Sequence, residues 1–427
     1  MATTTPDAKT PTSASDVASD VVVIGAGPAG ALAAARLATA GHRVRVIERE
    51  RFPRFSIGES LLPQCMEPLE RAGLLDAVRA GHYQPKNGAA FTRHGLGTVI
   101  DFHDKTTPGW SDTFQVERAD FDQRLIEAAQ ARGARVDFAT TVESVEPDAH
   151  RPALTIRDET GHTQRLETRF ILDASGYGRV LARQLGLARD PRLEPRTALF
   201  THVEILLDDD FDREKILIGV HPNDPQLWYW LIPFREGRAS VGVVGDTATL
   251  EAAGNDAESR WRALIDAEPR FAELLADARP VRPIQALAGY SADVERLHGP
   301  GYALLGNAGE FLDPVFSSGV TIALRSADMA TTLLERQLAG ERVDWDTEFE
   351  DPLRAGVATF RAFVDAWYDG RLQTIIFQRD PPAELRRMIS AVLAGYAWDR
   401  DNPFVSASRR RLDVLAELCG HPMGGAS

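Results

Sequence analysis

Three glycines and one acid near the start of the chain have the types and spacing of a dinucleotide-binding site. Gly25, Gly27 and Gly30 follow the apolar run VVVI at 21–24, and Glu48 lies eighteen residues beyond the last glycine. In such a motif the first glycine permits a tight turn, the second lets the backbone approach a pyrophosphate, and the third lets a helix pack close to the strand. The acid then accepts hydrogen bonds from the ribose hydroxyls.

A lysine and two tryptophans are the next residues with chemical potential. Lys86 lies between Pro85 and the small, apolar run GAAF at 88–91. A lysine is usually a solvated surface charge, but burial in such a setting lowers its pKa and makes the neutral amine accessible. Trp228 and Trp230 stand two residues apart in a predicted strand and therefore point to the same face. Aromatic residues in that pattern line either a core or a site.

The glycine motif is positioned by a predicted unit of strand, turn, helix and strand. After the first strand, an alanine-rich helix starts with Pro28 and Ala29 and extends to about Ala40, and a second strand at 44–47 ends before the acid. The N-terminus of this helix offers unpaired N–H groups and the positive end of its dipole to phosphates. The alternative is a glycine turn in an ordinary α/β unit.

Two later segments are predicted to return the chain to the same sheet. The run FILDASG at 170–176 reads as a buried strand ending in Asp173. The run YALLGNAGEFLDP at 302–314 reads as a strand followed by Gly306 and a loop with Asp313. Because the ends of parallel strands meet at one edge of a sheet, these residues are expected near the glycine turn.

The loop that leaves the second strand lies close to the same edge. It offers Arg54, Gly58, Glu59 and Ser60 as candidate cofactor contacts, although an exposed polar loop is the plainer alternative. An amphipathic helix beginning at Arg118 follows a series of short β-like segments. No general base stands out by its position. The candidates for a general base are Glu59, Glu310 and Asp313, but the sequence does not show how their side chains are oriented.

Composition limits the functions that the chain can have. It has 427 residues and a formal net charge of −14, which argues against a nucleic-acid or anionic-membrane surface. Cys65 and Cys419 suggest neither a disulfide framework nor a metal site, which fits a reducing cytoplasm. Residues 1–18 have no apolar core and read as a disordered tail rather than a signal peptide. No run of about eighteen apolar residues predicts a membrane span.

Three segments together resemble a single flavin site. VVIGAGPAG, LDASG and LLGNAGEFLDP are similar to the motifs of the flavoprotein monooxygenase superfamily, which implies FAD as the cofactor. Within that superfamily the chain most resembles the flavin-dependent halogenases, of the phenol- and pyrrole-directed kind. The resemblance rests on FPRFSIGES at 52–60, the lysine in QPKNGAAF at 84–91, the WxWxIP pattern in LWYWLIP, and DPVFSSGV at 313–320.

The resemblance implies an α/β fold with a discontinuous FAD-binding, Rossmann-like domain of the p-hydroxybenzoate-hydroxylase type, an antiparallel substrate-side sheet and a helical C-terminus. The expected boundaries are 19–80, 115–185 and 296–340 for the FAD domain, 81–114 and 186–295 for the sheet domain, and 341–420 for the helical region. The expected FAD contacts are Gly25, Gly27, Pro28, Ala29, Gly30, Glu48, Arg49, Arg54, Ser60, Arg118, Asp173, Gly306 and Asp313.

Halogenation makes specific demands of such a site. Reduced flavin and O2 form a hydroperoxide, and chloride or bromide must attack it to give hypohalous acid while the substrate is kept away from the flavin. The resemblance assigns the halogen-carrying role to Lys86, as a hydrogen-bond donor or a haloamine, and the dividing wall to Trp228 and Trp230. Halide needs N–H donors, which the segment Ser317, Ser318 and Gly319 offers where it enters a helix.

One departure from the family pattern bears on the substrate. Tryptophan-directed members carry a glutamate at the position of Phe316, and that carboxylate is missing here. The expected substrate is therefore a phenol or pyrrole, whose lone pairs activate the ring, rather than free tryptophan. Some relatives of this kind act on rings tethered to an acyl carrier protein. Substrate choice is expected to depend on aromatic residues of the C-terminal helices, which could equally be core.

The expected activity is thus an FADH2-dependent halogenase of secondary metabolism, supplied by a separate NAD(P)H flavin reductase because no second nucleotide motif is visible. No metal is expected. Two alternatives stay open. One is an NAD(P)H-dependent aromatic hydroxylase or related flavin oxidoreductase, and the other is a catalytically idle flavoprotein that serves as a binding partner in a biosynthetic assembly.

Overall fold

Strand β1, Val21–Ile24, lies near the middle of a six-stranded sheet with the order β20-β21-β11-β1-β2-β7. The computed structural model describes residues 19–379 and 381–421, so the predicted tail lies outside the described residues. All four side chains of β1 are buried, as expected for a parallel strand covered on both faces. The sheet is parallel except for its β20–β21 edge. The other strands are β2 (Val44–Ile47), β7 (Arg135–Asp137), β11 (Phe170–Asp173), β20 (His298–Gly299) and β21 (Tyr302–Leu304).

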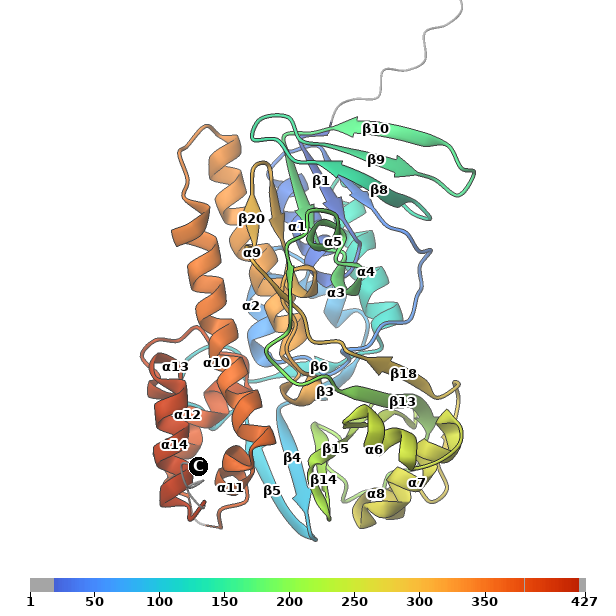
Figure 1. The fold of residues 1–427 in the computed structure, drawn as a ribbon, viewed down its shortest axis with the longest axis vertical. Helices are drawn as coiled ribbons and strands as arrows, with labels where there is room; N and C mark the ends of the chain where they lie inside the picture. Colours follow the sequence, from blue (N-terminus) through green and yellow to red (C-terminus); the bar gives the residue numbers. More distant parts are fainter. Residues whose placement is uncertain (1–18, 380, 422–427) are drawn as a thin grey trace, which may run out of the picture.

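Three helices pack side by side against this sheet (Figure 1). Helix α1, Pro28–Thr39, lies between α4, Arg118–Gln130, and α9, Ser318–Leu338. Small alanines let α1 approach both the sheet and its neighbours closely, and Ala31–Ala35 are completely buried. The antiparallel sheet β10-β9-β8 adds side chains to the same core and lies at the upper end of the molecule in Figure 1. Its strands are β8 (Thr141–Glu146), β9 (Ala153–Arg157) and β10 (Thr163–Glu167).

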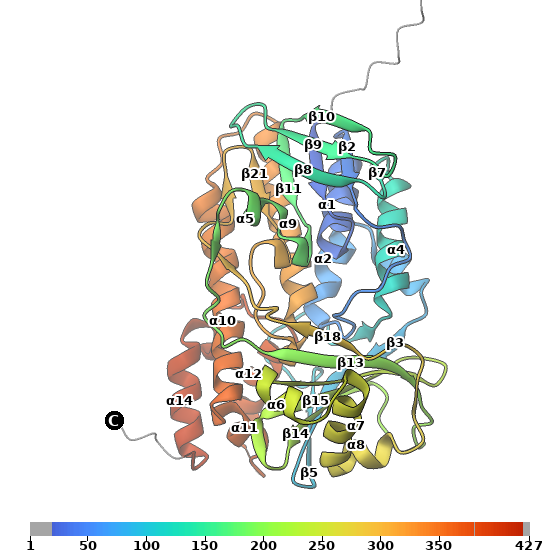
Figure 2. The same cartoon turned by 45° about the vertical axis from the view of Figure 1, so that its right-hand side comes forward.

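A second sheet occupies the lower half of the molecule in both views (Figures 1 and 2). Its order is β17-β13-β16-β15-β14-β4-β5, with β18 also paired to β13. The predicted antiparallel arrangement is confirmed, with the exception of β4 and β14, which pair in parallel. The strands are β4 (Gly88–Arg93), β5 (Leu96–Asp101), β13 (Thr197–Glu204), β14 (Lys215–His221), β15 (Asp224–Pro233), β16 (Arg238–Gly245), β17 (Arg279–Pro280) and β18 (Gln285–Ala288).

Strand β15 separates two cores because its side chains alternate between the faces of the sheet. Tyr229 belongs to a core that includes Trp261 and Phe271 of the helices packed beside it. Trp228 and Trp230 face the opposite side, toward the C-terminal helices and the first sheet. The helices beside Tyr229 are α6 (Thr247–Ala252), α7 (Ala257–Ala267) and α8 (Pro269–Leu274).

The predicted helical C-terminal region is present, and its long helix connects both halves of the molecule (Figure 2). Helix α10, Asp351–Tyr368, contacts α9 of the upper half as well as the lower helices. Trp367 is fully buried and Tyr396 is 7% exposed, so these aromatic side chains belong to the core. The lower helices are α11 (Arg371–Ile376), α12 (Ala383–Leu393), α13 (Pro403–Ser406) and α14 (Ser408–Leu418).

Short elements complete the described chain. Strands β3 (Gln84–Lys86) and β6 (Thr113–Gln115) form a separate antiparallel pair between the two large sheets. The remaining α-helices and strands are α2 (Met66–Arg71), α3 (Leu75–Arg79), α5 (Val180–Gln184) and the pair β12 (Ala188–Arg189) and β19 (Asp293–Val294). Among residues 19–379 and 381–421, no helix combines the length and apolar character needed to cross a membrane.

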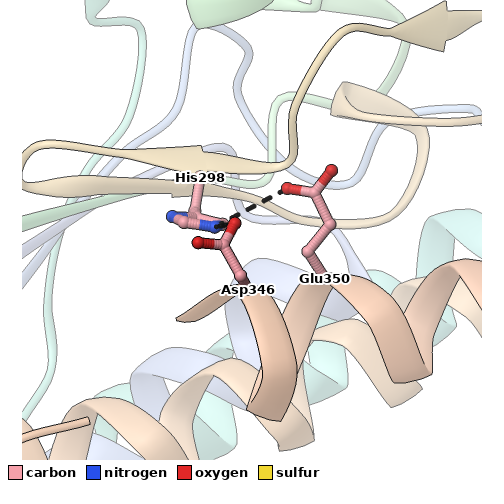
Figure 3. A group of neighbouring side chains, drawn as sticks. All are labelled: His298, Asp346 and Glu350. Carbon is pink, nitrogen blue, oxygen red and sulfur yellow. Dashed lines mark hydrogen bonds and ion pairs between the residues drawn. The ribbon is translucent and has the colours of Figure 1, made fainter. Parts of the chain in front are cut away.

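A polar cluster joins the edge of the first sheet to the start of the long helix (Figure 3). His298 of β20 contacts Asp346 at 3.0 Å and Glu350 at 3.7 Å, both on the π-helical turn Asp346–Glu350. The oxygens of Glu350 also accept hydrogen bonds from the backbone N–H of Leu297 and from Arg354. The cluster is therefore explained by ion pairs and hydrogen bonds within the protein, which link β20 to the start of α10.

Candidate functional site

One cavity of about 440 Å³ extends from the glycine turn to the tryptophan face of β15. Three turns that are far apart in the sequence meet at its upper end: the turn after β1, the turn after β11 and the segment between β21 and α9. The lower end is formed by the second sheet. The predicted site residues that line it are Gly25, Gly27, Pro28, Ala29, Glu48, Arg49, Arg54, Ser60, Arg118, Trp228, Trp230, Ser317 and Gly319.

The glycine turn has the close contacts that its sequence predicts. Gly25 has φ +94°, and a Cβ there would stand 2.5 Å from the carbonyl oxygen of Ala174. A Cβ on Gly30 would stand 2.0 Å from the carbonyl oxygen of Gly25. At Gly27, in contrast, the nearest atom is a guanidinium nitrogen of Arg54 at 3.6 Å, so the backbone is open toward the cavity. Gly27 is also the N-cap of α1 and brings no side chain to its first N–H groups.

Glu48 is fixed at the end of β2 by two backbone N–H groups. One carboxylate oxygen accepts from Ala26 at 2.8 Å and the other from Glu50 at 2.9 Å. The residue is 5% exposed and lines the cavity. This arrangement stabilises the charged carboxylate without using all of its lone pairs. The free lone pairs are available to hydroxyl groups of a ribose.

Two arginines that line the cavity share one buried acid. Asp122 of α4 has no exposed side-chain surface, and its oxygens accept from Arg54 at 3.0 Å and from Arg118 at 2.7 and 2.9 Å. Arg118 also donates to the carbonyls of Ile57 and Gly58, which ties the 51–60 loop to α4. Asp122 thus fixes both guanidinium groups in position. Sequence reasoning did not identify Asp122, although its i+4 spacing from Arg118 on a helix could have indicated the ion pair.

These residues fit FAD. An open glycine backbone at a helix start, two held arginines and a capped acid at the second strand end supply donors to a pyrophosphate and acceptors to a ribose. The neighbouring wall is formed by backbone-rich segments, Ala174–Tyr177 and Leu305–Asn307, with little side-chain bulk. The flavin would therefore lie further along the cavity, toward Gly58 and the two tryptophans.

Both tryptophans of β15 line the cavity and both are held by hydrogen bonds. Their rings lie 5.9 Å apart, and less than 5% of each residue is exposed. Trp228 donates to the hydroxyl of Tyr368 at 2.9 Å, and Trp230 donates to Ser240 at 3.1 Å. Tyr368 in turn donates to Asp313 at 2.9 Å. Two bulky indoles held in this way form a rigid apolar wall at the lower end of the cavity.

Lys86 lies immediately behind the cavity. Only 1% of the residue is exposed, and its Nζ donates to Ser60 Oγ at 2.7 Å and to the carbonyl of Leu61 at 2.8 Å. Lys86 is not itself a lining residue, whereas Ser60 is. Burial lowers the pKa of Lys86 to about 7, so the amine and the ammonium are both populated near neutrality.

The helix start proposed to bind halide is partly turned into the cavity. Ser317 has φ +56° and lines the cavity together with Gly319. Ser318, the first residue of α9, is 2% exposed and faces the core. A Cβ on Gly319 would stand 2.9 Å from the ring of Phe311. The absence of a side chain at Gly319 therefore lets the Phe311 ring pack directly against the start of α9.

Several predicted contacts support the cavity without lining it. Asp173 accepts from the N–H groups of Ser175 and Leu181, and so shapes the second turn. Asp313 caps a 3₁₀ turn and accepts from Tyr290 and Tyr368. Burial raises the pKa of both carboxyls. Outside the lining residues are Gly30, Lys86, Asp173, Gly306, Asp313 and Ser318.

Sequence reasoning missed most of the apolar lining. These residues come from the 51–60 loop, the turn after β11, the second sheet, the segment after β21 and the start of α9, and their pattern in the sequence is that of ordinary core. They are Phe55, Ile57, Tyr177, Phe200, Ile216, Ile232, Leu287, Phe311 and Val320. No lining residue comes from beyond Ala323. Among the described residues, the C-terminal helices therefore do not line the cavity, and Tyr368 of α10 contacts it only indirectly, as the hydrogen-bond acceptor of Trp228.

Comparison with known proteins agrees with this geometry. A family model described as "FAD binding domain" matches residues 18–347. A flavoprotein/dehydrogenase from Cytophaga hutchinsonii is 40% identical and superimposes with a TM-score of 0.92 over 95% of this chain and 99% of its own. The myxobacterial chondrochloren halogenase is 29% identical, with a TM-score of 0.76 over 94% and 96%.

A curated relative extends the comparison to the sequence level. The 1H-pyrrole-2-carbonyl peptidyl-carrier-protein chlorinase of Pseudomonas fluorescens is 28% identical over 93% of this chain and 92% of its own length. The match thus includes the FAD-binding cavity, the second sheet and most of the C-terminal helices. The chain belongs to the FAD-binding-domain family, and its relatives in that family include proteins named as flavin-dependent halogenases.

Proposed function

We propose that the chain halogenates an electron-rich aromatic ring, phenolic or pyrrolic, with hypohalous acid made from chloride or bromide and O2. The observation that carries the proposal is the position of Lys86. It is a buried lysine with a depressed pKa, bound to a residue of the cavity wall, and it lies on the strand pair between the FAD-binding sheet and the substrate-side sheet.

The cofactor, reduced by a separate NAD(P)H flavin reductase, supplies the oxidant that converts halide into hypohalous acid. The N–H of Ser317 already donates to the carbonyl of Pro314 at 3.0 Å, so the donor proposed for the halide is the backbone N–H of Gly319 in the first turn of α9. The indoles of Trp228 and Trp230 fill the space through which a ring would otherwise reach the flavin. This wall favours halogenation over hydroxylation of the ring.

Lys86 has the hydrogen-bonding capacity for the transfer step. Two of its Nζ–H bonds are used by Ser60 and Leu61. The ammonium form then keeps one further donor, which can polarise hypohalous acid, and the amine form keeps a lone pair, which can accept the halogen. With a pKa of about 7, either form is reached at neutral pH at small cost in free energy.

The substrate proposal follows from Phe316 and from the relatives. Phe316 is buried against Phe363 and Trp367, so no carboxylate occupies that position. The chlorinase from P. fluorescens is named for a pyrrole ring on a carrier protein. We therefore include carrier-bound pyrroles beside free phenols as candidate substrates.

The test is an incubation with FAD, a flavin reductase, NADH, bromide and a panel of phenols, pyrroles and indoles, free and as carrier-protein thioesters. Mass spectrometry should show the bromine isotope pair on a phenol or pyrrole. Lys86→Met should abolish bromination while FAD still binds, and Lys105→Met, which changes a lysine outside the cavity, should not. Hydroxylated product made from NADPH without reductase or halide would establish the hydroxylase instead.

A further inference from the structure

Glu59 presents an unusual carboxylate to the cavity. It follows Gly58 in the 51–60 loop, lines the cavity and has no exposed side-chain surface. One oxygen, Oε1, lies 2.6 Å from Nε2 of His202. The other, Oε2, is buried and has no hydrogen-bond partner among the described residues. Leaving a buried carboxylate oxygen unpaired costs roughly 1–3 kcal/mol or more, so its position calls for a ligand.

The surroundings hold this carboxylate in one orientation. His202 of β13 packs edge-on against the rings of Phe55 and Phe234, at 5.6 and 5.3 Å. The charged groups that face the pair from other elements are Arg118 and Glu117. Arg238 of β16 neutralises Glu117 at 2.9 Å. The bond from His202 thus engages Oε1 and leaves Oε2 as the oxygen available to a ligand.

The sequence places this acceptor beside the residue that anchors the lysine. Ser60, the next residue, accepts the hydrogen bond from Lys86 and also lines the cavity. A free carboxylate oxygen and the anchor of a reactive amine thus belong to two successive residues. Halogen transfer needs both an electrophile donor and a base, because the ring that gains halogen must lose a proton.

We propose that Glu59, oriented by His202, is the base that accepts the proton from the halogenated ring. This inference rests on the proposed function. In the step, the ring carbon forms a bond to halogen as the halogen–oxygen bond of hypohalous acid breaks, and hydroxide leaves as water with a proton from Lys86. The carbon–hydrogen bond then breaks, its electron pair restores the aromatic ring, and the proton passes to Oε2 of Glu59.

A carboxylate is strong enough for this role. The ring cation formed by halogen attack is a strong acid, so its base needs correct placement more than a high pKa. The bond from His202 leaves Oε2 free and fixes its direction, which makes His202 a positioning residue. The base here comes from the loop after β2, whereas Phe316 occupies the position where tryptophan-directed relatives carry their glutamate.

The first experiment separates oxidant formation from ring halogenation. Glu59→Gln keeps the shape of the side chain but cannot take up a proton. With phloroglucinol or the best ring of the panel, we expect bromination to fall about 10²-fold or more. Hypobromous acid output, measured as sulfoxide formed from added methionine, should stay within about twofold of the wild type. Glu117→Gln, which changes a neighbouring acid outside the cavity, is the matched control.

The second experiment asks whether the lost group is a base. Glu59→Ala leaves room for a small carboxylate, so added formate should restore bromination in proportion to its concentration. Formate should not rescue Lys86→Met, whose defect is in halogen transfer. His202→Phe should lower kcat with a small change in KM, and it should not respond to formate because Glu59 still fills its own place.

The outcomes distinguish this inference from the proposed function. A wild type that brominates no ring of the panel contradicts both. A wild type that brominates, with Glu59→Gln at wild-type rate or Glu59→Ala unaffected by formate, overturns the role of Glu59 alone. Parallel loss of bromination and of hypobromous acid in Glu59→Gln would mean that the carboxylate serves the flavin.

Discussion

Burial at Lys86 couples the protonation of one amine to the stability of the whole fold. An unfolded lysine has a pKa of about 10.4, and in the folded chain burial lowers the value to about 7. Between these pH values the unfolded chain binds one proton more than the folded chain. The free energy of unfolding must therefore rise with pH in this window and fall as pH drops toward 7.

We expect this contribution to disappear in Lys86→Met. Relative to that variant, the wild type should gain about 1.4 kcal/mol per pH unit between pH 7 and 10. Urea unfolding of both proteins at pH 7.5 and 9.0 measures the difference, which should be about 2 kcal/mol. Equal pH dependence in the two proteins would show that Lys86 stays charged in the fold.

The site residues differ in how far the sequence could locate them. The sequence could locate Gly25, Glu48 and Trp230, which line the cavity. The regular geometry of the strand, turn and helix fixes the direction in which the backbone or side chain of each one points. Asp173 and Asp313 follow strands of the same sheet edge, yet their side chains turn into backbone N–H groups and tyrosine hydroxyls. The partners of Asp173 are local, because Ser175 and Leu181 follow it by two and eight residues. Asp313 depends on Tyr290 and Tyr368 from other segments, which no local pattern could reveal.

At the level of elements, the turn after β1 packs so closely against the turn after β11 that Gly25 has no room for a side chain. This restricts the position more strongly than its positive φ does. Gly25 and Gly41 have similar φ angles, +94° and +88°, but a Cβ on Gly41 meets nothing within 4 Å. Gly41→Ala should therefore cost about 1 kcal/mol of stability from backbone strain. Gly25→Ala, which collides with the carbonyl of Ala174, should cost more and abolish FAD binding. Urea unfolding and FAD fluorescence quenching measure the pair.

The contact between α10 and β15 gives a second test at this level. Tyr368→Phe removes the acceptor of the Trp228 N–H and leaves that group buried without a partner, which should cost about 1–2 kcal/mol. Tyr290→Phe also removes a hydrogen bond to Asp313 but leaves Trp228 satisfied, so it should cost less. Urea unfolding compares the two. A shift of tryptophan fluorescence is expected only for Tyr368→Phe.

Element boundaries were predictable where periodicity was strong. The first strand, α1, α4 and strands β13 to β16 of the second sheet lie where their patterns indicate, whereas the short strands β17 and β18 were not predicted. The parallel pairing of β4 with β14 was not predictable, because each strand alternates in the same way whichever direction its neighbour runs. The roles of the C-terminal aromatics were likewise open. Helical spacing gives a buried face but does not distinguish a core from a cavity.

For the whole molecule, the C-terminal helices are part of the main core. Trp367, Phe360 and Phe363 pack in the same cluster as Trp228, Trp230 and Phe91 of the second sheet. A chain ending at residue 340 would expose this surface and should not fold. Its soluble yield and circular dichroism should show the loss, whereas a chain starting at residue 19 should bind FAD normally. A soluble, FAD-binding truncation at 340 would contradict this account.

The arrangement of the cavity has a consequence for the synthesis of the protein. Its walls come from the turn after β1, the 51–60 loop, the turn after β11, strand β15 and the start of α9, with Lys86 behind them. Long sequence separations of this kind slow folding, and a nascent chain lacks α9 until most residues have been made. A fragment that ends before Ser317 and α9 contains the phosphate cradle, Lys86 and both indoles but lacks the wall that Ser317, Gly319 and Val320 supply. A chain released early or cut by a protease would therefore lack one wall of the cavity and, under the proposed function, could not contain a diffusible oxidant.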